Sequence, residues 1–518
     1  MLAAIAGCSG GTGGGGGGGT TDGGTNGTGG DTNGTSAGGG TNGTNGTSGG
    51  SGDDVAAGEK PDDVEGWFAE AAKPYEGTTL ALVTESTPSS LYYKNEITPR
   101  FQEVTGINVD FSAVAFGEMY NREVSTAVSN DSSLDIGYIE QDASNAYAQK
   151  GWLVDMDEFR NSHPDITMPG FDVEDFTSFQ TNLQYPPGEG PNFSYMMESG
   201  LKMLCYNQDV YDEHADDMYN PNEMITPDQY REVTKTIQEN ADMAGHSQQQ
   251  KGVTGPYALT ESYWPMFGVY DWGLNPEEGW VALESRGGTM NSQRAIDGLK
   301  FYKEMGDQYA TGNWKSLTWS GVPDTISSKQ AAGGMIYGEN VQKVMKALGD
   351  SASSGLNPAS KNTQKEMGMS DGEAPASQGK AYMGYYNGAG WGIMDASEKK
   401  EAAYLFIQWM LRPSASKSLA QNVGLIVRNS SFEAVMDGEI NNKTGYFDRF
   451  KEHQDKYVGC RVGEVQKALV EGPIFDWFHQ FTAGEIDAET AANEMAWDCE
   501  QVMNRMGFLG STLDEKPF

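Results

Sequence analysis

Basic residues are scarce in this chain of 518 residues. Lys and Arg number 35 against 73 Asp and Glu, which leaves a formal charge of −38 at pH 7. Phosphate repels such a surface, so the composition excludes a nucleic-acid-binding protein and disfavours docking on anionic lipid headgroups. The acidic residues lie in segments that also carry 11 Trp, 24 Tyr and 20 Phe, which indicates the solvated surface of a folded protein. Because salt screens repulsion between surface charges, the composition also indicates adaptation to high salt.

Long apolar runs are absent as well. No stretch of 18 apolar residues occurs, so no segment is expected to cross a bilayer as a helix.

Cysteine and histidine are rare, and neither is arranged for catalysis or metal binding. The 4 Cys and 5 His form no CxxC pair and no zinc-site spacing. Cys205 is expected to be a buried thiol, whereas Cys460 and Cys499 either pair or remain free. Two G-x-S-x-G matches fall in low-complexity sequence that cannot present a nucleophile. We therefore expect no metal, no cofactor and no enzymatic activity.

The N-terminal segment is typical of an exported, anchored protein. Ile5-Ala6-Gly7 precede Cys8, which resembles the lipobox of lipoproteins and predicts lipidation of Cys8. The basic region and longer apolar segment of a secretory peptide are missing, so an incidental cysteine is the alternative. Residues 9–58 are almost entirely Gly, Thr, Asn, Ser and Asp, a composition that predicts a flexible tether. Together these features predict a body held by a lipid anchor at the extracellular face of a membrane.

Strands and helices alternate at the start of the body. Strands are expected at 79–84, 107–114 and 134–139, and helices at 91–104 and 116–129. This alternation predicts an α/β fold with a parallel sheet, whose ligand crevice lies at the carboxyl ends of the strands. Residues 350–378, which are rich in Ser, Gly, Asn and Ala, are expected to form a surface loop.

Seven segments of the body carry a resemblance to a known family. In chain order they are ITPRFQEVTGINVDFSAV (97–114), SLDIGYIEQDASNAYAQKGWLVDMDEF (133–159), LKMLCYNQDVYDE (201–213), TPDQYREVTKTI (226–237), SKQAAGGMIYGEN (328–340), GYYNGAGWGIMDASEKKEAAYLFIQWML (384–411) and IFDWFHQFTAGEIDAETAANEM (474–495). Each alone is a strand or helix that many α/β proteins contain. Their order and spacing together resemble the family 1 extracellular solute-binding proteins of ABC importers, the group that contains the maltose-binding proteins.

The resemblance implies a two-lobed, periplasmic-binding-protein-like (type II) α/β fold with a hinge and an interlobe cleft. It also implies a monomeric receptor that takes a small solute, a carbohydrate by this resemblance, to ABC permease subunits. The implied division is 1–8 as lipobox remnant, 9–75 as tether and acidic lead-in, 76–202 with 381–413 as lobe 1, and 203–380 with 414–510 as lobe 2.

A sugar site needs aromatic rings for the apolar sugar faces and carboxylates or amides for the hydroxyl rim. The resemblance implies ten ligand-binding positions, namely Glu85, Ser86, Gln141, Asp142, Trp264, Tyr337, Asn340, Asn387, Trp391 and Trp477. Each has a structural alternative: a Trp more often fills a core, as expected for Trp409, and Asp142 can cap a helix.

Two alternatives for function remain open. The first keeps the family but replaces the sugar by a polyamine, a polyol phosphate or a metal chelate. A polyamine would be drawn to Glu85, Asp142 and Glu339, whereas a phosphate would require Lys or Arg in the cleft. The second is a secreted glycoside hydrolase that uses two of the many carboxylates.

Overall fold

The structure, a computed structural model, describes residues 62–186, 188–275, 278–369, 384–458, 469–509 and 511–518. The lipobox-like residues 5–8 and the Gly-rich segment 9–58 therefore lie outside the described residues, and lipidation of Cys8 stays a prediction. The ranges below all belong to the body of the chain.

One sheet runs through the described residues, in the order β2-β1-β3-β7-β4-β5, with β6 beside β4 and β8 beside β7. Its strands are β1 (Thr79–Glu85), β2 (Asn108–Val114), β3 (Ile136–Glu140), β4 (Tyr195–Asn207), β5 (Gly333–Tyr337), β6 (Ala352–Gly355), β7 (Gly384–Ile393) and β8 (Tyr457–Val458).

The first strands confirm the predicted parallel arrangement. β1 pairs with β2 in parallel, beginning at Thr79 opposite Asn108, and also pairs with β3 in parallel. The predicted helix 116–129 is α4 (Phe116–Ser129). The helix predicted at 91–104 is divided instead into α2 (Pro88–Tyr92) and α3 (Thr98–Thr105), joined by a π-helical turn. A proline lies in the first turn of each part, where its missing N–H is tolerated.

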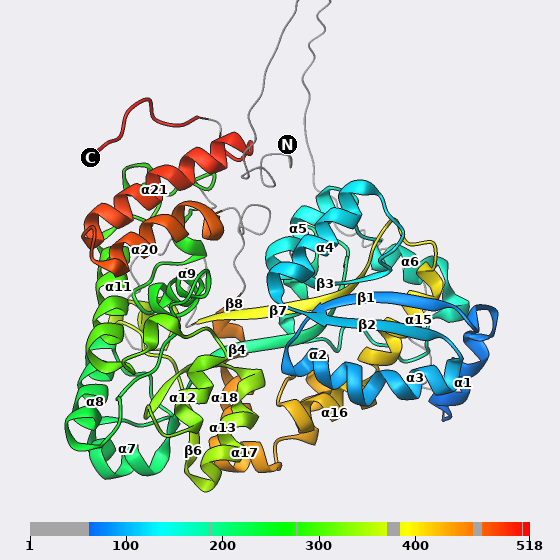
Figure 1. Cartoon of the computed structure of the whole chain (residues 1–518), viewed down its shortest axis with the longest axis horizontal. Coiled ribbons are helices and arrows are strands. Elements are labelled where there is room, and N and C mark those ends of the chain that lie inside the picture. The colour runs from blue at the N-terminus through cyan, green and yellow to red at the C-terminus, as the bar shows by residue number, and fades with distance from the viewer. Residues whose placement is uncertain (1–61, 187, 276–277, 370–383, 459–468, 510) are drawn as a thin grey trace, which may run out of the picture. The chain divides into compact units, whose positions relative to one another are not determined.

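Strand β4 joins the two halves of the sheet. It pairs with β7 from Tyr195 to Leu201 and with β5 from Lys202 to Tyr206. β4 and β7 lie side by side across the middle of the sheet (Figure 1). Every residue of β4 is buried, which explains its long apolar run, Met203 to Tyr206 included.

Buried apolar side chains form two clusters. The first draws on α3, α4, α1 (Val64–Ala71), α5 (Gln141–Gln149), α6 (Met156–Ser162), α12 (Gly321–Ser327), α13 (Val341–Leu348), α15 (Lys400–Leu411), α16 (Pro413–Val423), α17 (Glu439–Thr444) and α18 (Tyr446–His453). The second draws on α7 (Gln208–Ala215), α8 (Pro227–Asn240), α9 (Thr254–Ala258), α10 (Trp264–Met266), α11 (Gln293–Glu304), α20 (Phe475–Ala483) and α21 (Ala488–Arg505).

Aromatic packing ties α1, in the acidic lead-in, to the body. Phe68 is fully buried, and its ring lies edge-on to Trp409 with centroids 5.1 Å apart. Trp409 is itself fully buried, which confirms its expected place in the core.

The predicted surface loop at 350–378 is wrong over its described part. Residues 352–355 form β6, which pairs with β4, and α14 (Lys361–Glu366) follows. Small side chains here permit close packing rather than mobility: a Cβ on Gly355 would collide with the hydroxyl of Tyr219. Residues 352–359 are buried throughout.

Cys205 and Cys499 are both free, buried thiols, as predicted for Cys205. Cys460 lies outside the described residues.

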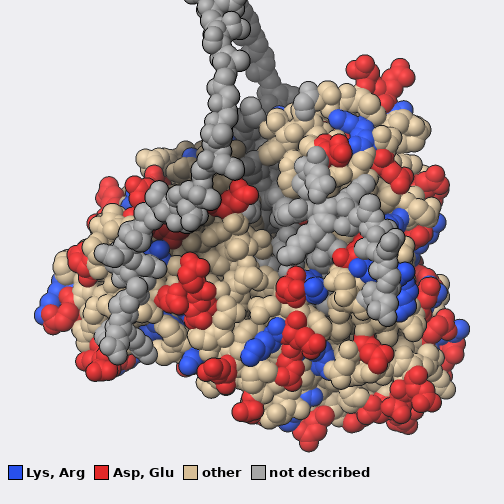
Figure 2. All heavy atoms as spheres, turned by 180° about the vertical axis from the view of Figure 1, so that it is seen from behind, with Lys and Arg blue, Asp and Glu red and all other residues tan. Residues whose placement is uncertain are grey.

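Acidic side chains are spread over the face of the molecule seen in Figure 2, with Lys and Arg scattered among them. Among the helices that the structure describes, none is both long and apolar enough to span a membrane.

Candidate functional site

The carboxyl ends of β1 and β3 bring acidic side chains together. Glu85 ends β1, Glu140 ends the neighbouring strand β3, and Gln141 begins α5 directly after it. Burial raises the pKa of the Tyr138 hydroxyl, and the charges of Glu198, Glu85 and Glu140 add to the rise in that order. Ser86 is exposed and Glu85 is half-buried, so this edge of the sheet remains open to solvent. The predicted positions at the two strand ends thus lie on adjacent strands, as the parallel sheet requires.

Glu198 lies at the centre of this group of charges. It is buried in β4 and accepts hydrogen bonds from the Tyr138 hydroxyl at 2.5 Å, from Thr87 Oγ1 at 3.0 Å and from Ser89 Oγ. Burial raises the pKa of Glu198, and these three donors oppose the rise by stabilising the carboxylate. The donors hold its side chain in one orientation.

The end of β5 adds a second acidic group. Tyr337 ends β5, and the 3-10 turn Gly338–Asn340 follows it. Asn340 Nδ2 donates to Glu339 Oε1 at 3.2 Å. Burial, together with the charges of Glu198 and Glu85, raises the pKa of Glu339 to about 8. Glu339 is therefore neutral near pH 7 and can donate a hydrogen bond, which an ionised carboxylate cannot.

A buried ion pair lies beside this turn. Lys202 Nζ is 3.1 Å from Glu261 Oε2, and the two side chains are 2% and 1% exposed. The Tyr337 hydroxyl also donates to Glu261, and the Lys202 ammonium lies 4.6 Å from the centre of the Tyr337 ring. Burial lowers the pKa of Lys202, while Glu261 and Glu339 raise it. The cation is thus already matched by a carboxylate of the same chain.

We call these side chains the carboxylate cluster; its members are Glu85, Tyr138, Glu140, Glu198, Lys202, Glu261, Tyr337 and Glu339. It offers carboxylate oxygens and one neutral acid, a set suited to the hydroxyl groups of a small polar solute. Within the described ranges, no group of three His, Cys, Asp or Glu side chains is placed to hold a metal ion.

Two of the predicted tryptophans have no exposed surface. Trp264 and Trp391 are both 0% exposed. Trp264 Nε1 donates to the Ala295 carbonyl at 3.2 Å, and the Trp391 ring packs edge-on against Tyr93, Phe111 and Tyr138. In this conformation neither ring has surface with which to stack on a solute.

Trp477 is half-buried against the second apolar cluster, and its Nε1 donates to Asp498 Oδ2 at 2.8 Å. It lies in α20, so its contact with a solute stays a prediction.

Asp142 lies in α5, and Asn387 lies in β7 opposite Gly200 of β4. The side chains of Asp142 and Asn387 are outside the described part of the structure, so both remain predictions.

Sequence reasoning did not select Tyr138, Glu140, Glu198, Lys202 or Glu261 as site residues. A signal for two of them is present: Glu198 and Lys202 are charged residues inside the otherwise apolar run YMMESGLKMLCYN. A charge in a fully buried strand needs a partner, and such pairs gather at functional sites.

A family model described as a bacterial extracellular solute-binding protein matches residues 96–446. The chain belongs to this family. A comparison with curated proteins returns no match.

Solved structures share the fold of this solute-binding protein. A solute-binding protein of Agrobacterium radiobacter K84 in complex with ribitol is 17% identical, with a TM-score of 0.65 over 83% of this chain and 100% of that one. Maltose-bound MalE3 of T. maritima is 14% identical, with a TM-score of 0.66 over 82% and 100% of the two chains. The GacH receptor of Streptomyces glaucescens, solved unliganded and with acarbose, is 17% identical, with a TM-score of 0.65 over 82% and 98%. Identities this low establish the fold, which is the predicted two-lobed α/β architecture.

Proposed function

We propose that this chain captures a small polyhydroxylated solute, a sugar or a polyol, and delivers it to the permease of an ABC importer. The observation that carries the proposal is the carboxylate cluster at the carboxyl ends of β1, β3 and β5 in a chain of the solute-binding family.

The charges of the cluster support a neutral solute over an anionic one. Glu85, Glu140 and Glu198 are acidic, and Lys202 is already paired with Glu261 at 3.1 Å. A phosphate would need a cation to neutralise it, and the cation in this cluster is committed to its own carboxylate. Hydroxyl groups, in contrast, both accept from a neutral acid such as Glu339 and donate to carboxylates.

Several similar structures hold ligands of this class. Their ligands are ribitol, maltose, D-mannitol and alpha-D-tagatose. Glycerophosphocholine, held by UgpB of Mycobacterium tuberculosis, shows that the fold also admits a phosphodiester. The identity of the solute of this chain therefore has to be inferred from its own side chains, and these favour hydroxyl groups.

Solute capture would close two discontinuous lobes, 76–202 with 381–413 and 203–380 with 414–510. The partner change of β4 between Leu201 and Lys202 supports a crossing at this point. A solute that contacts both lobes stabilises the closed state by interactions that the open state lacks.

The chain would act at the extracellular face of the membrane. Lipidated Cys8 would anchor it there, and the segment 9–58 would tether the body within reach of the permease. The extracellular family supports the location, and the composition of the N-terminal sequence supports the anchor.

A thermal-shift screen of the full chain tests this function. The panel contains maltose, ribitol, D-mannitol and D-tagatose, with glycerol 3-phosphate and spermidine for the other solute classes. A solute that binds the native state raises the midpoint by mass action. We expect a shift with at least one sugar or polyol and none with glycerol 3-phosphate.

Spermidine tests a second candidate function, capture of a polyamine, because the carboxylates of the cluster attract cations. Shifts with spermidine alone would keep the receptor but replace the sugar by a polyamine. Release of reducing sugar from an oligosaccharide would instead indicate a glycoside hydrolase, and silence across the panel would contradict the proposal.

A further inference from the structure

A small cavity lies next to the Lys202–Glu261 pair. Lys202, Gln248, Gln249, Ser262 and Tyr263 contribute to its wall, and it has room for about one water-sized group. Its wall comes from β4, from the segment before α9 and from the π-helical turn Leu259–Tyr263. Ala258 and Met335 add apolar surface to this wall, so the buried polar side chains face a cavity of mixed character.

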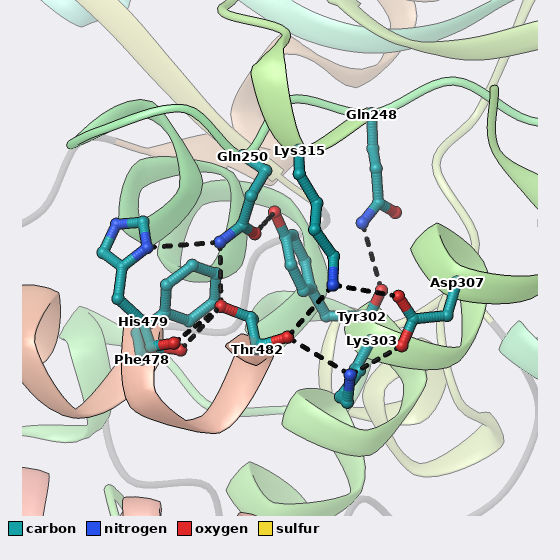
Figure 3. A network of polar contacts seen from close by, with 9 residues as sticks. All are labelled: Gln248, Gln250, Tyr302, Lys303, Asp307, Lys315, Phe478, His479 and Thr482. Atoms are coloured by element: carbon teal, nitrogen blue, oxygen red, sulfur yellow. Dashed lines mark hydrogen bonds and ion pairs between the residues drawn. The ribbon is translucent and has the colours of Figure 1, made fainter. Parts of the chain in front are cut away.

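Part of this wall is held rigidly by its own hydrogen bonds. Gln248 donates from Nε2 to the Tyr302 carbonyl at 3.1 Å, as Figure 3 shows, and accepts from the Tyr263 hydroxyl at 2.7 Å. Gln249 donates to the Thr254 carbonyl at 2.7 Å. These amides form a fixed frame around the cavity.

Ser262 differs from its neighbours. Its side chain is fully buried, and its Oγ has no hydrogen-bond partner. A buried hydroxyl without a partner costs free energy, so such a group on the wall of a cavity indicates a ligand or a water that supplies the missing bond. Lys202 Nζ, which has three N–H donors, uses one of them for Glu261.

The cavity adjoins the carboxylate cluster through Lys202. The same ammonium that lines the cavity pairs with Glu261, lies over the Tyr337 ring and responds to the charge of Glu339. Lys202 thus borders both the cavity and the cluster residues Tyr337 and Glu339.

We propose that this cavity is a subsite for one hydroxyl group of the solute, held between Lys202 Nζ and Ser262 Oγ. This rests on the proposed function. A hydroxyl oxygen accepts from the ammonium and its proton is donated to Ser262, so one atom satisfies both groups. An amine would be repelled by Lys202, a methyl group would leave Ser262 unpaired, and a carboxylate would meet Glu261.

Substitution of Ser262 tests the subsite. Binding of maltose, ribitol, D-mannitol and D-tagatose to the full chain is measured by isothermal titration, for the wild type, Ser262→Ala and Ser262→Val. We expect the best solute to bind about ten-fold more weakly to Ser262→Ala, because one hydrogen bond to the hydroxyl is lost. Ser262→Val should weaken binding at least as much, because its methyl groups occupy the cavity.

Ser431→Ala is the matched control. Ser431 is also fully buried with an unpartnered Oγ, but it lies in the segment Asn429–Ala434, away from the cavity wall. The affinity of Ser431→Ala for the best solute should equal that of the wild type.

The outcomes separate the subsite from the function. Wild-type binding with unchanged affinity in both Ser262 variants would mean that the cavity holds water only, and would overturn the subsite while the receptor stands. If Ser262→Val does not fold, Ser262→Ala alone decides. A wild type that binds none of the four solutes would remove the proposed function and the subsite together.

Discussion

Glu339 is the residue whose charge state is most sensitive to its surroundings. Burial and the charges of Glu198 and Glu85 raise its pKa to about 8. The unfolded chain would ionise the same carboxyl near pH 4.5, so folding takes up a proton between these values. The stability that Glu339 contributes is therefore complete below pH 4.5 and is lost as the pH rises through about 8.

This sign gives a prediction for Glu339→Gln, which keeps the hydrogen-bonding shape but cannot ionise. As the pH rises from 5 to 9, the free energy of unfolding of the wild type should fall by at least about 1 kcal/mol more than that of the variant. Urea unfolding of both proteins at the two pH values measures the difference. Parallel pH profiles for the two proteins would show that Glu339 is not the group that titrates.

Lys202 and Glu261 form a pair that depends on both members. Removal of one partner leaves an uncompensated buried charge, which costs about 3–5 kcal/mol, whereas replacement of both by neutral groups is far less costly. Lys202→Met alone should therefore destabilise the protein by about that amount, and Lys202→Met with Glu261→Gln should recover most of it. Urea unfolding of these two variants and of Glu261→Gln gives a double-mutant cycle. Equal losses of unfolding free energy in the single and double variants would contradict a coupled pair.

Strand β7 packs closely because its glycines leave room for its neighbours. A Cβ on Gly390 would lie 2.6 Å from Ser194 Oγ and 2.9 Å from Leu183 Cδ1. Gly390→Ala should thus force a shift in the sheet and cost about 1–3 kcal/mol. Gly312→Ala is the control, because a Cβ there meets nothing within 4 Å. The melting temperatures of the two variants are compared with that of the wild type. An unchanged melting temperature for Gly390→Ala would mean that the sheet adjusts to the methyl group without cost.

Helix α20 shows how the second cluster is held in place. Lys303 and Lys315 both donate to the Thr482 carbonyl, in the last turn of the helix, at 3.2 and 3.4 Å (Figure 3). Cations stabilise the C-terminal end of a helix, where the backbone carbonyls lack partners. Gln250 donates to Thr482 Oγ1 at 2.8 Å, so the same turn is bonded from a third segment.

The sequence predicted the positions of strands and helices better than it predicted contacts between side chains. The apolar pattern located β2 and α4, because burial of one face imposes a period on the sequence of a strand or a helix. The resemblance implied Glu85 and Gln141 as site positions, and both lie at strand ends in the structure, while their contact with a solute stays a prediction. The sequence could not show that Trp264 and Trp391 are buried, because a Trp in a core and a Trp at a solute have the same local sequence. The pairing of Lys202 with Glu261 joins residues 59 positions apart, which no local pattern records.

At the scale of the whole molecule, the formal charge of −38 sets the dependence on salt. Figure 2 shows acidic side chains across the visible face rather than in one patch. Repulsion among them opposes the compact state, and salt screens it over about 10 Å at 0.1 M and about 3 Å at 1 M.

We therefore predict that the melting temperature of the full chain rises between 0.1 M and 2 M KCl. The same titration with sodium chloride separates screening from a potassium-specific effect. A melting temperature that stays constant or falls with salt would contradict adaptation to high salt and leave the acidic surface without this role.

The central claim is that the carboxylate cluster holds a neutral polyhydroxylated solute. Its most direct test is isothermal titration of the full chain with the sugar or polyol that gives the largest thermal shift, for the wild type and Glu85→Gln with Tyr337→Phe. The account predicts saturable binding at one site per chain and at least ten-fold weaker binding in the double variant, with the fold retained. Equal affinity in the two proteins would place the solute elsewhere and contradict the account.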